Sequence, residues 1–181
     1  MILIGTKVTL RPLERQDLER SRNWVNNSDL AAALLRVWPV TEIDQENWFE
    51  SLCTRPDRLV WAVLASERHI GNVGLYHLDL LHRRAEAWCL IGEPNSQGQG
   101  LGRQAMELLL SYGYNGLGLN KIYLHVASEN TMALKMYRTL GFITEGELQA
   151  EYFIQGRFRD ILRLRLLVQE WASAKKNMGG V

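Results

Sequence analysis

Apolar and polar residues alternate in several short stretches of the chain, a pattern typical of β-strands. Five of these stretches precede the last helix-like segment, and two further strands are expected near the C-terminus. A tight turn at Glu67-Arg68 predicts that the second and third stretches form a hairpin. The first five predicted strands are 7–11, 59–65, 70–81, 85–91 and 121–127.

Apolar residues at helical spacing predict four helices between these strands. The first covers 17–27 and ends in the polar residues 26–29. The second begins after Thr41, an N-cap residue that is followed by acidic residues in the first turn. The third begins near Leu101, and the fourth ends just before Gly141, which serves as its C-cap.

Length and composition predict one folded domain over 1–181. The chain has 181 residues, of which 46% are hydrophobic and 23% are charged, as in an ordinary globular domain. No proline- or glycine-rich linker divides it. Only the tail, from about 175 to 181, is expected to be frayed.

Charge and cysteine usage exclude several classes of function. A formal net charge of +1 is too balanced to indicate a nucleic-acid or membrane partner. Cys53 and Cys89 lack C-x-x-C spacing, so we expect two buried, inert thiols and no bound metal. No apolar run approaches the ~20 residues that cross a membrane, and the start lacks a basic leader, so we expect a cytoplasmic protein.

A glycine-rich turn joins the strand 85–91 to the helix that begins near Leu101. In Gln97-Gly98-Gln99-Gly100-Leu101-Gly102, several backbone N–H groups can point to one spot, where the helix dipole also favours an anion. The turn is not a nucleoside-triphosphate P-loop, because Arg103-Gln104 follows it instead of Lys-Ser/Thr. A dinucleotide fingerprint also fails, because Arg103 stands where its third glycine should be. The alternative interpretation is that the glycine-rich turn only connects the strand to the helix and binds nothing.

This turn resembles the pyrophosphate-binding motif, Gln-x-x-Gly-x-Gly, of the GNAT superfamily of acetyl-CoA-dependent N-acyltransferases. Farther along, Asn130-x-x-Ala133-x-x-x-Tyr137, followed by Gly141-Phe142, resembles the final GNAT signature. Asn130, Ala133 and Tyr137 share one face of the predicted helix. The two motifs lie in the right order on elements of the right type, and the resemblance extends over nearly the whole chain.

The resemblance implies both a fold and a co-substrate. The fold is the GNAT-type α/β (α+β) fold: a mixed, mostly antiparallel central sheet flanked by helices, with a splay between the fourth and fifth predicted strands. Acetyl-CoA would bind at the splay, and no metal is needed. The residues expected to bind it are Leu90, Ile91, Gly92, Gln97, Gly98, Gln99, Gly100, Leu101, Gly102, Arg103, Asn130, Ala133 and Tyr137.

Acetyl transfer from a thioester to an amine requires a neutral amine and a protonated leaving thiol. By the resemblance, Tyr137 is the general acid, and core packing is its alternative role.

Glu86 is the candidate general base, because it shares a strand face with large apolar side chains. An ion pair with Arg83 or Arg84 is an equally good interpretation of Glu86. Two histidines, His82 and His125, are weaker candidates for a proton relay.

The acceptor amine is less well defined. In the superfamily the first two helices and the C-terminal hairpin usually wall the acceptor site, here 24–48 and 147–159. Such a wall suits a polyamine, an amino sugar or a peptide N-terminus. Its candidate residues are Trp24, Asp29, Arg36, Trp38, Glu42, Trp48, Glu151 and Tyr152.

The overall pattern resembles the branch that contains ribosomal-protein N-terminal acetyltransferases, spermidine acetyltransferases and the amino-sugar acetyltransferases of surface-polysaccharide biosynthesis. Shorter stretches at 82–86, 120–124 and 145–147 look particularly like the spermidine enzymes. One observation argues against spermidine as the acceptor: 29–44 holds only scattered acids, and Arg36 would oppose a polycation.

The sequence therefore predicts an N-acetyltransferase that uses acetyl-CoA and acts on a small-molecule amine or a peptide N-terminus. A catalytically silent acyl-CoA-binding module is the alternative, and a homodimer is the expected association.

Overall fold

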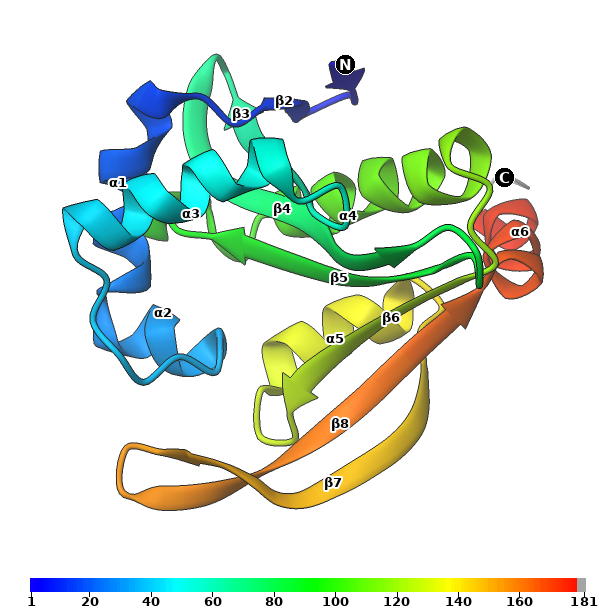
Figure 1. Ribbon diagram of the computed structural model, residues 1–181. Helices are drawn as coiled ribbons and strands as arrows, with labels where there is room; N and C mark the ends of the chain where they lie inside the picture. Colours follow the sequence, from blue (N-terminus) through cyan, green and yellow to red (C-terminus); the bar gives the residue numbers. More distant parts are fainter. Residues whose placement is uncertain (179–181) are drawn as a thin grey trace.

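One eight-stranded sheet runs through residues 1–178, the part of the chain that the computed structural model describes (Figure 1). Its order is β1-β2-β3-β4-β5-β6-β8-β7, and all neighbours are antiparallel except β5 and β6. This mixed, mostly antiparallel sheet confirms the predicted fold class. The strands are β1 (Leu3–Ile4), β2 (Thr9–Pro12), β3 (Leu59–Ala65), β4 (Arg68–Asp79), β5 (Arg84–Ile91), β6 (Lys121–Ala127), β7 (Ile143–Ile154) and β8 (Arg157–Leu167).

Helices cover both faces of the sheet. Figure 1 shows α3 in front of β4 and β5 and α4 behind them, with the β7–β8 hairpin reaching away from the rest. The longer helices are α1 (Leu18–Val25), α2 (Ser28–Ala33), α3 (Glu42–Thr54), α4 (Leu101–Ser111), α5 (Thr131–Thr139) and α6 (Val168–Met178). Two 3₁₀ turns (Arg15–Asp17, Pro94–Ser96) and a π-helical turn (Tyr112–Gly116) complete the helical elements.

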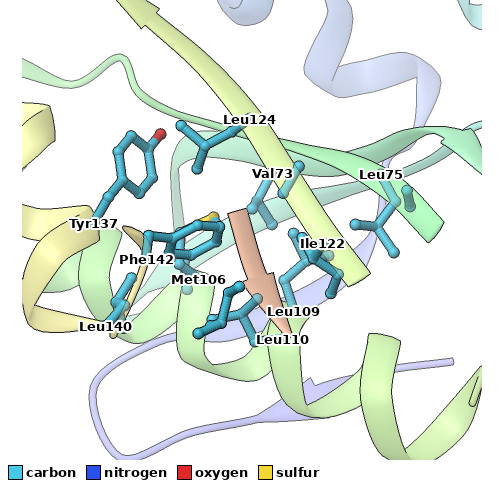
Figure 2. Packing of buried hydrophobic residues seen from close by; sticks show 14 of the residues in the cluster. Val73, Leu75, Met106, Leu109, Leu110, Ile122, Leu124, Tyr137, Leu140 and Phe142 are labelled. Carbon is cyan, nitrogen blue, oxygen red and sulfur yellow. The ribbon is translucent and has the colours of Figure 1, made fainter. Parts of the chain in front are cut away.

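The main core lies between the sheet and the α4–α5 side (Figure 2). Leu109 and Leu110 of α4 are fully buried against Ile122 of β6 and Leu75 of β4. Burial of each such side chain contributes about 1.5–3 kcal/mol relative to exposure. A smaller cluster on the opposite face packs α1 and α3 on β3. The contacts of the main core fix the position of α4 and α5 relative to β5 and β6.

Strands β5 and β6 separate after a short paired segment. Their parallel pairing covers only Arg84–Glu86 against Lys121–Tyr123. Beyond it, β5 stays paired with β4 as far as Ile91, and β6 pairs with β8. The predicted splay is therefore present, and it leaves one edge of β5 without a strand partner.

Several elements differ from the sequence prediction. The polar residues 26–29, expected to form a break, contain the start of α2, because the Asn27 side chain accepts hydrogen bonds from two backbone N–H groups. β1 and α6 were not expected either. Strand β4 begins and ends two residues earlier than predicted, so Leu80 and Leu81 lie outside it and are exposed. Of the tail expected to fray, 175–178 belongs to α6 and 179–181 lies outside the described residues.

The predicted helix caps are confirmed. Thr41 and Asp44 form a reciprocal capping box at the start of α3. Gly141 follows α5 with φ +94°, a left-handed conformation that favours glycine. The prediction of two buried thiols is wrong for Cys53, which is exposed, whereas Cys89 is partly buried. Within 1–178 no helix is long and apolar enough to cross a membrane.

Candidate active site

The splay opens a cavity of about 620 Å³. One wall is β5 from Glu86 to Ile91, whose edge is unpaired beyond Glu86, and the glycine-rich turn and α5 form the others. Residues of α2 and Tyr152 of the β7–β8 hairpin close its outer side. Elements that are distant in the sequence therefore meet at one site.

The glycine-rich turn has the backbone shape that the sequence predicts. Gly98 and Gly100 have φ +71° and +77°, and a Cβ atom at either would meet nothing within 4 Å. These glycines are therefore required by backbone conformation and leave open space beside the turn. The Gln97 side chain donates to the Ile91 carbonyl at 2.9 Å, which ties the turn to the end of β5. Gly100 is the N-cap of α4, so free backbone N–H groups of the first helical turn lie here.

Two of the thirteen predicted acetyl-CoA residues, Gly92 and Gln99, do not line the cavity. The ring of Trp24 instead packs directly against Gly92, so that a Cβ atom added at Gly92 would come within 2.0 Å of the ring. Its backbone N–H donates to Ile70. The other eleven residues, from Leu90 to Tyr137, line the cavity together.

Helix α5 presents the second motif to the cavity. The Asn130 side chain accepts a hydrogen bond from the Ala133 backbone N–H at 3.1 Å and so caps the helix. This cap fixes the first turn of α5, and Asn130, Ala133 and Tyr137 all line the cavity along one helix face.

Tyr137 lies where the core meets the cavity. Figure 2 shows its ring beside Phe142, with the hydroxyl oxygen pointing away from Leu140 and Phe142. The residue is 6% exposed, yet the hydroxyl makes no hydrogen bond with any described residue. Burial raises the pKa of Tyr137, so the phenol keeps its proton at neutral pH. An unpartnered, protonated phenol at the cavity wall can donate a proton to a bound group.

Cys89 also lines this cavity, but it is not poised to react. Burial raises the pKa of its thiol to about 12, so the nucleophilic thiolate is scarcely populated at neutral pH.

Glu86 faces a histidine in the same cavity. Its Oε1 lies 2.7 Å from Nδ1 of His125, which comes from β6. Its Oε2 lies 3.6 Å from Nε2 of His77, in the irregular end of β4. Both Glu86 and His125 are about one quarter exposed, so water and a substrate can reach them.

The ion pair with Arg83 or Arg84, the alternative considered for Glu86, is not formed. Arg84 pairs with Asp79 instead. His82 is exposed and its backbone N–H donates to Asp79, so it lies outside the cavity.

His77 was missed by the sequence analysis. It has φ +50° where β4 loses register with β5, and alternation of apolar and polar residues carries no signal for such an irregularity.

The expected acceptor wall is only partly assembled. Arg36 and Trp48 line a second, smaller pocket, and Tyr152 lines the main cavity. Trp24 is buried against His69 and Gly92. The remaining candidates, which line neither space, are Asp29, Trp38, Glu42 and Glu151.

Comparison with known proteins decides the family. Residues 7–143 match the family model described as an acetyltransferase (GNAT) domain. The chain belongs to the GNAT acetyltransferase family. It is 34% identical over 176 residues to the spermidine N(1)-acetyltransferase of Escherichia coli (strain K12), covering 95% of this chain and 92% of that protein. The predicted branch is thereby confirmed.

Solved structures of GNAT enzymes show the same fold. The crystal structure of spermidine N-acetyltransferase from Vibrio cholerae in complex with CoA and spermine has a TM-score of 0.87 at 33% identity, covering 93% of this chain and 99% of that one. A dodecameric structure of the Vibrio cholerae enzyme has a TM-score of 0.79 at 32% identity, covering 92% and 97%.

This GNAT protein is therefore an acetyl-CoA-dependent N-acetyltransferase that acetylates a primary amine. Its residues suit the co-substrate, because the positive-φ glycines leave room for an anion beside free N–H groups. The unpaired β5 edge can also hydrogen-bond an extended, amide-containing chain.

Proposed function

We propose that Glu86, with His125, is the general base and Tyr137 the general acid of direct acetyl transfer from acetyl-CoA to a bound amine. The supporting observation is their convergence: the Glu86–His125 pair and the unpartnered Tyr137 hydroxyl line one cavity with the glycine-rich turn. Bound acetyl-CoA supplies the activated acetyl thioester.

Two elements of the protein bind different parts of acetyl-CoA. The backbone N–H groups of the turn from Gln97 to Arg103 hold the pyrophosphate at the start of α4. The free edge of β5, at Leu90 and Ile91, pairs with the amides of the pantetheine arm. A backbone N–H of this edge also stabilises the oxyanion.

Glu86 removes the proton that the acceptor brings to the site. An alkyl ammonium has a pKa near ~10, so it must be deprotonated before its nitrogen can attack the thioester carbonyl. Glu86 takes this proton directly or through water, and His125 fixes the orientation of the carboxylate by their 2.7 Å contact. As the C–S bond breaks, Tyr137 delivers its phenolic proton to the sulfur, and the second proton that the nitrogen loses as the amide forms returns to the Tyr137 oxygen.

The acceptor is a small-molecule amine or a peptide N-terminus, and the relatives named for spermidine support an aliphatic amine. The dodecameric relative supports assembly of more than one copy, of which a homodimer is the simplest form. The two unpaired cysteines suit the reducing cytoplasm, where we place the protein.

The direct test follows free thiol from acetyl-CoA and the acetylated product by mass spectrometry. The acceptors are spermidine, nucleotide-linked amino sugars, aminoglycosides and short peptides with free N-termini. We expect stoichiometric thiol and N-acetyl product with at least one class. Acetyl-CoA binding, measured by calorimetry, without product from any class would favour the catalytically silent acyl-CoA-binding module.

A further inference from the structure

A second pocket, of about 300 Å³, adjoins the acetyl-transfer cavity. The two spaces share Leu34, Glu86, Trp88 and Leu90 as lining residues. An amine placed at Glu86 can therefore extend into the second pocket. This pocket lies among α1, α3, β4 and the loop after α2.

The floor of the second pocket is aromatic and fixed. Trp48 Nε1 donates a hydrogen bond to the Tyr76 hydroxyl at 3.0 Å. The Tyr76 ring in turn packs 5.5 Å from the ring of Trp88. These contacts hold the three rings in place, so the pocket is ready to receive a short hydrocarbon segment or a flat group.

Gln45 places an unused amide in this pocket. The residue is 7% exposed and lines the pocket from α3. Its side chain makes no hydrogen bond with any residue in the described part of the chain. The amide has donors and an acceptor free for a ligand that enters the pocket, and a ligand with polar groups can use them.

The two carboxylates of the second pocket are already engaged within the protein. Asp44 accepts hydrogen bonds from the Thr41 backbone N–H, at 3.0 Å, and from its hydroxyl, at 2.6 Å. Glu86 faces His125 and His77. Asp44 accepts both bonds through Oδ2 as part of the α3 cap, and Glu86 is the group that meets the reacting amine.

The cation of the pocket is not engaged. Arg36 lines the pocket and forms no ion pair or side-chain hydrogen bond with any described residue. Arg58 adds a second positive charge, 5.1 Å from the centre of the Tyr76 ring. Burial raises the pKa of Tyr76, whereas the hydrogen bond from Trp48 and the charges of Arg58 and Arg36 oppose that rise.

We infer that the acceptor carries an anionic group, a carboxylate or a phosphate, besides its amine, and that Arg36 and Gln45 bind this group. This inference rests on the proposed function, because it places the amine at Glu86. A guanidinium and an amide together offer several N–H donors to an anion. A polyamine would instead bring a second positive charge against Arg36. Among amines, this pocket therefore selects for an acidic group.

The test compares three acceptors of equal chain length: a linear diamine, the corresponding ω-amino carboxylic acid and the corresponding aminoalkyl phosphate. The activity measured is kcat/KM for acetylated product. The wild-type protein should favour one or both acidic acceptors over the diamine by about tenfold or more. The carboxylate and phosphate arms show which anion is bound.

Substitutions at Arg36 test whether its positive charge causes the preference for acidic acceptors. Arg36→Gln should remove the preference through KM, with kcat nearly unchanged, and Arg36→Glu should reverse it toward the diamine. Arg55→Gln is the matched control, because Arg55 pairs with Asp57 and lines neither cavity, and it should retain the wild-type preference. Gln45→Leu should raise KM for the acidic acceptors more than for the diamine.

The outcomes separate the inference from the proposed function. A wild-type preference for the diamine, or a preference for acidic acceptors that Arg36→Glu leaves intact, would overturn the inference while acetylation itself stands. No acetylated product from any amine would overturn the proposed function as well.

Discussion

Glu86 Oε1 lies 2.7 Å from His125 Nδ1, although the two residues are 39 positions apart in the chain. The short parallel pairing of β5 with β6 creates this contact. It places Glu86 of β5 opposite Tyr123 of β6, and His125 lies two residues farther along β6. The same pairing ends immediately afterwards, so the contact lies where the cavity opens.

This contact predicts that Glu86 and His125 act as one unit. Glu86→Gln and His125→Gln should each lower kcat by about 10²-fold, and the double variant should be little worse than Glu86→Gln alone. The measurement is kcat with a saturating amine. His82→Gln, a histidine outside the cavity, serves as the control. Losses that multiply in the double variant would show independent roles.

The glycine-rich turn predicts a specific binding defect. Gly100→Ala forces a residue with a Cβ atom to adopt φ +77°, which costs about 1–2 kcal/mol. The turn would relax and its N–H groups would lose their common direction, so we expect about tenfold weaker acetyl-CoA binding by calorimetry. Gly146→Ala is the matched control, because that site has open space and no positive φ. Equal affinity of Gly100→Ala and wild type would remove the turn from the binding site.

A buried charged cluster predicts acid sensitivity. Asp17 is 4% exposed and accepts two hydrogen bonds from Arg11, at 2.6 and 2.8 Å. Burial opposes ionisation of Asp17, but Arg11 and the Glu14 backbone N–H outweigh it and lower the carboxyl pKa. Burial lowers the pKa of neighbouring His69. Both groups therefore bind fewer protons in the folded than in the unfolded protein.

Stability should consequently fall as the pH is lowered. The loss begins below the ordinary histidine pKa of about 6.5 through His69, and continues below the ordinary aspartate pKa of about 3.9 as Asp17 is protonated. Asp17→Asn should cost roughly 2–4 kcal/mol at neutral pH, because it leaves Arg11 without its partner. Urea unfolding across this pH range measures both effects. Stability that rises on acidification would contradict the assignment.

Local periodicity and glycine conformation were sufficient for strands β2–β6, the glycine-rich turn and helix α5, whereas the splay of the sheet followed only from the family resemblance. The sequence was insufficient where long-range packing decides. Glu86 had two equally good interpretations, a general base or an ion pair with Arg83 or Arg84, and only the β5–β6 register shows that it lies beside His125. Gly92 matched the cofactor strand, but the distant Trp24 ring occupies its open side. α2 was missed because Asn27 is typical both of a polar break and of a helix cap.

The most direct test of the central claim is the thiol release of Tyr137→Phe from acetyl-CoA with the best amine acceptor. The hydroxyl has no partner within the described residues, so its removal should leave the melting temperature and acetyl-CoA affinity near wild type. Tyr114→Phe is the matched control, because it removes the 2.8 Å hydrogen bond to Leu166 and should lower stability but not kcat. We predict that Tyr137→Phe lowers kcat by about 10²–10⁴-fold. Turnover equal to wild type would contradict the role of Tyr137 as the acid of this site.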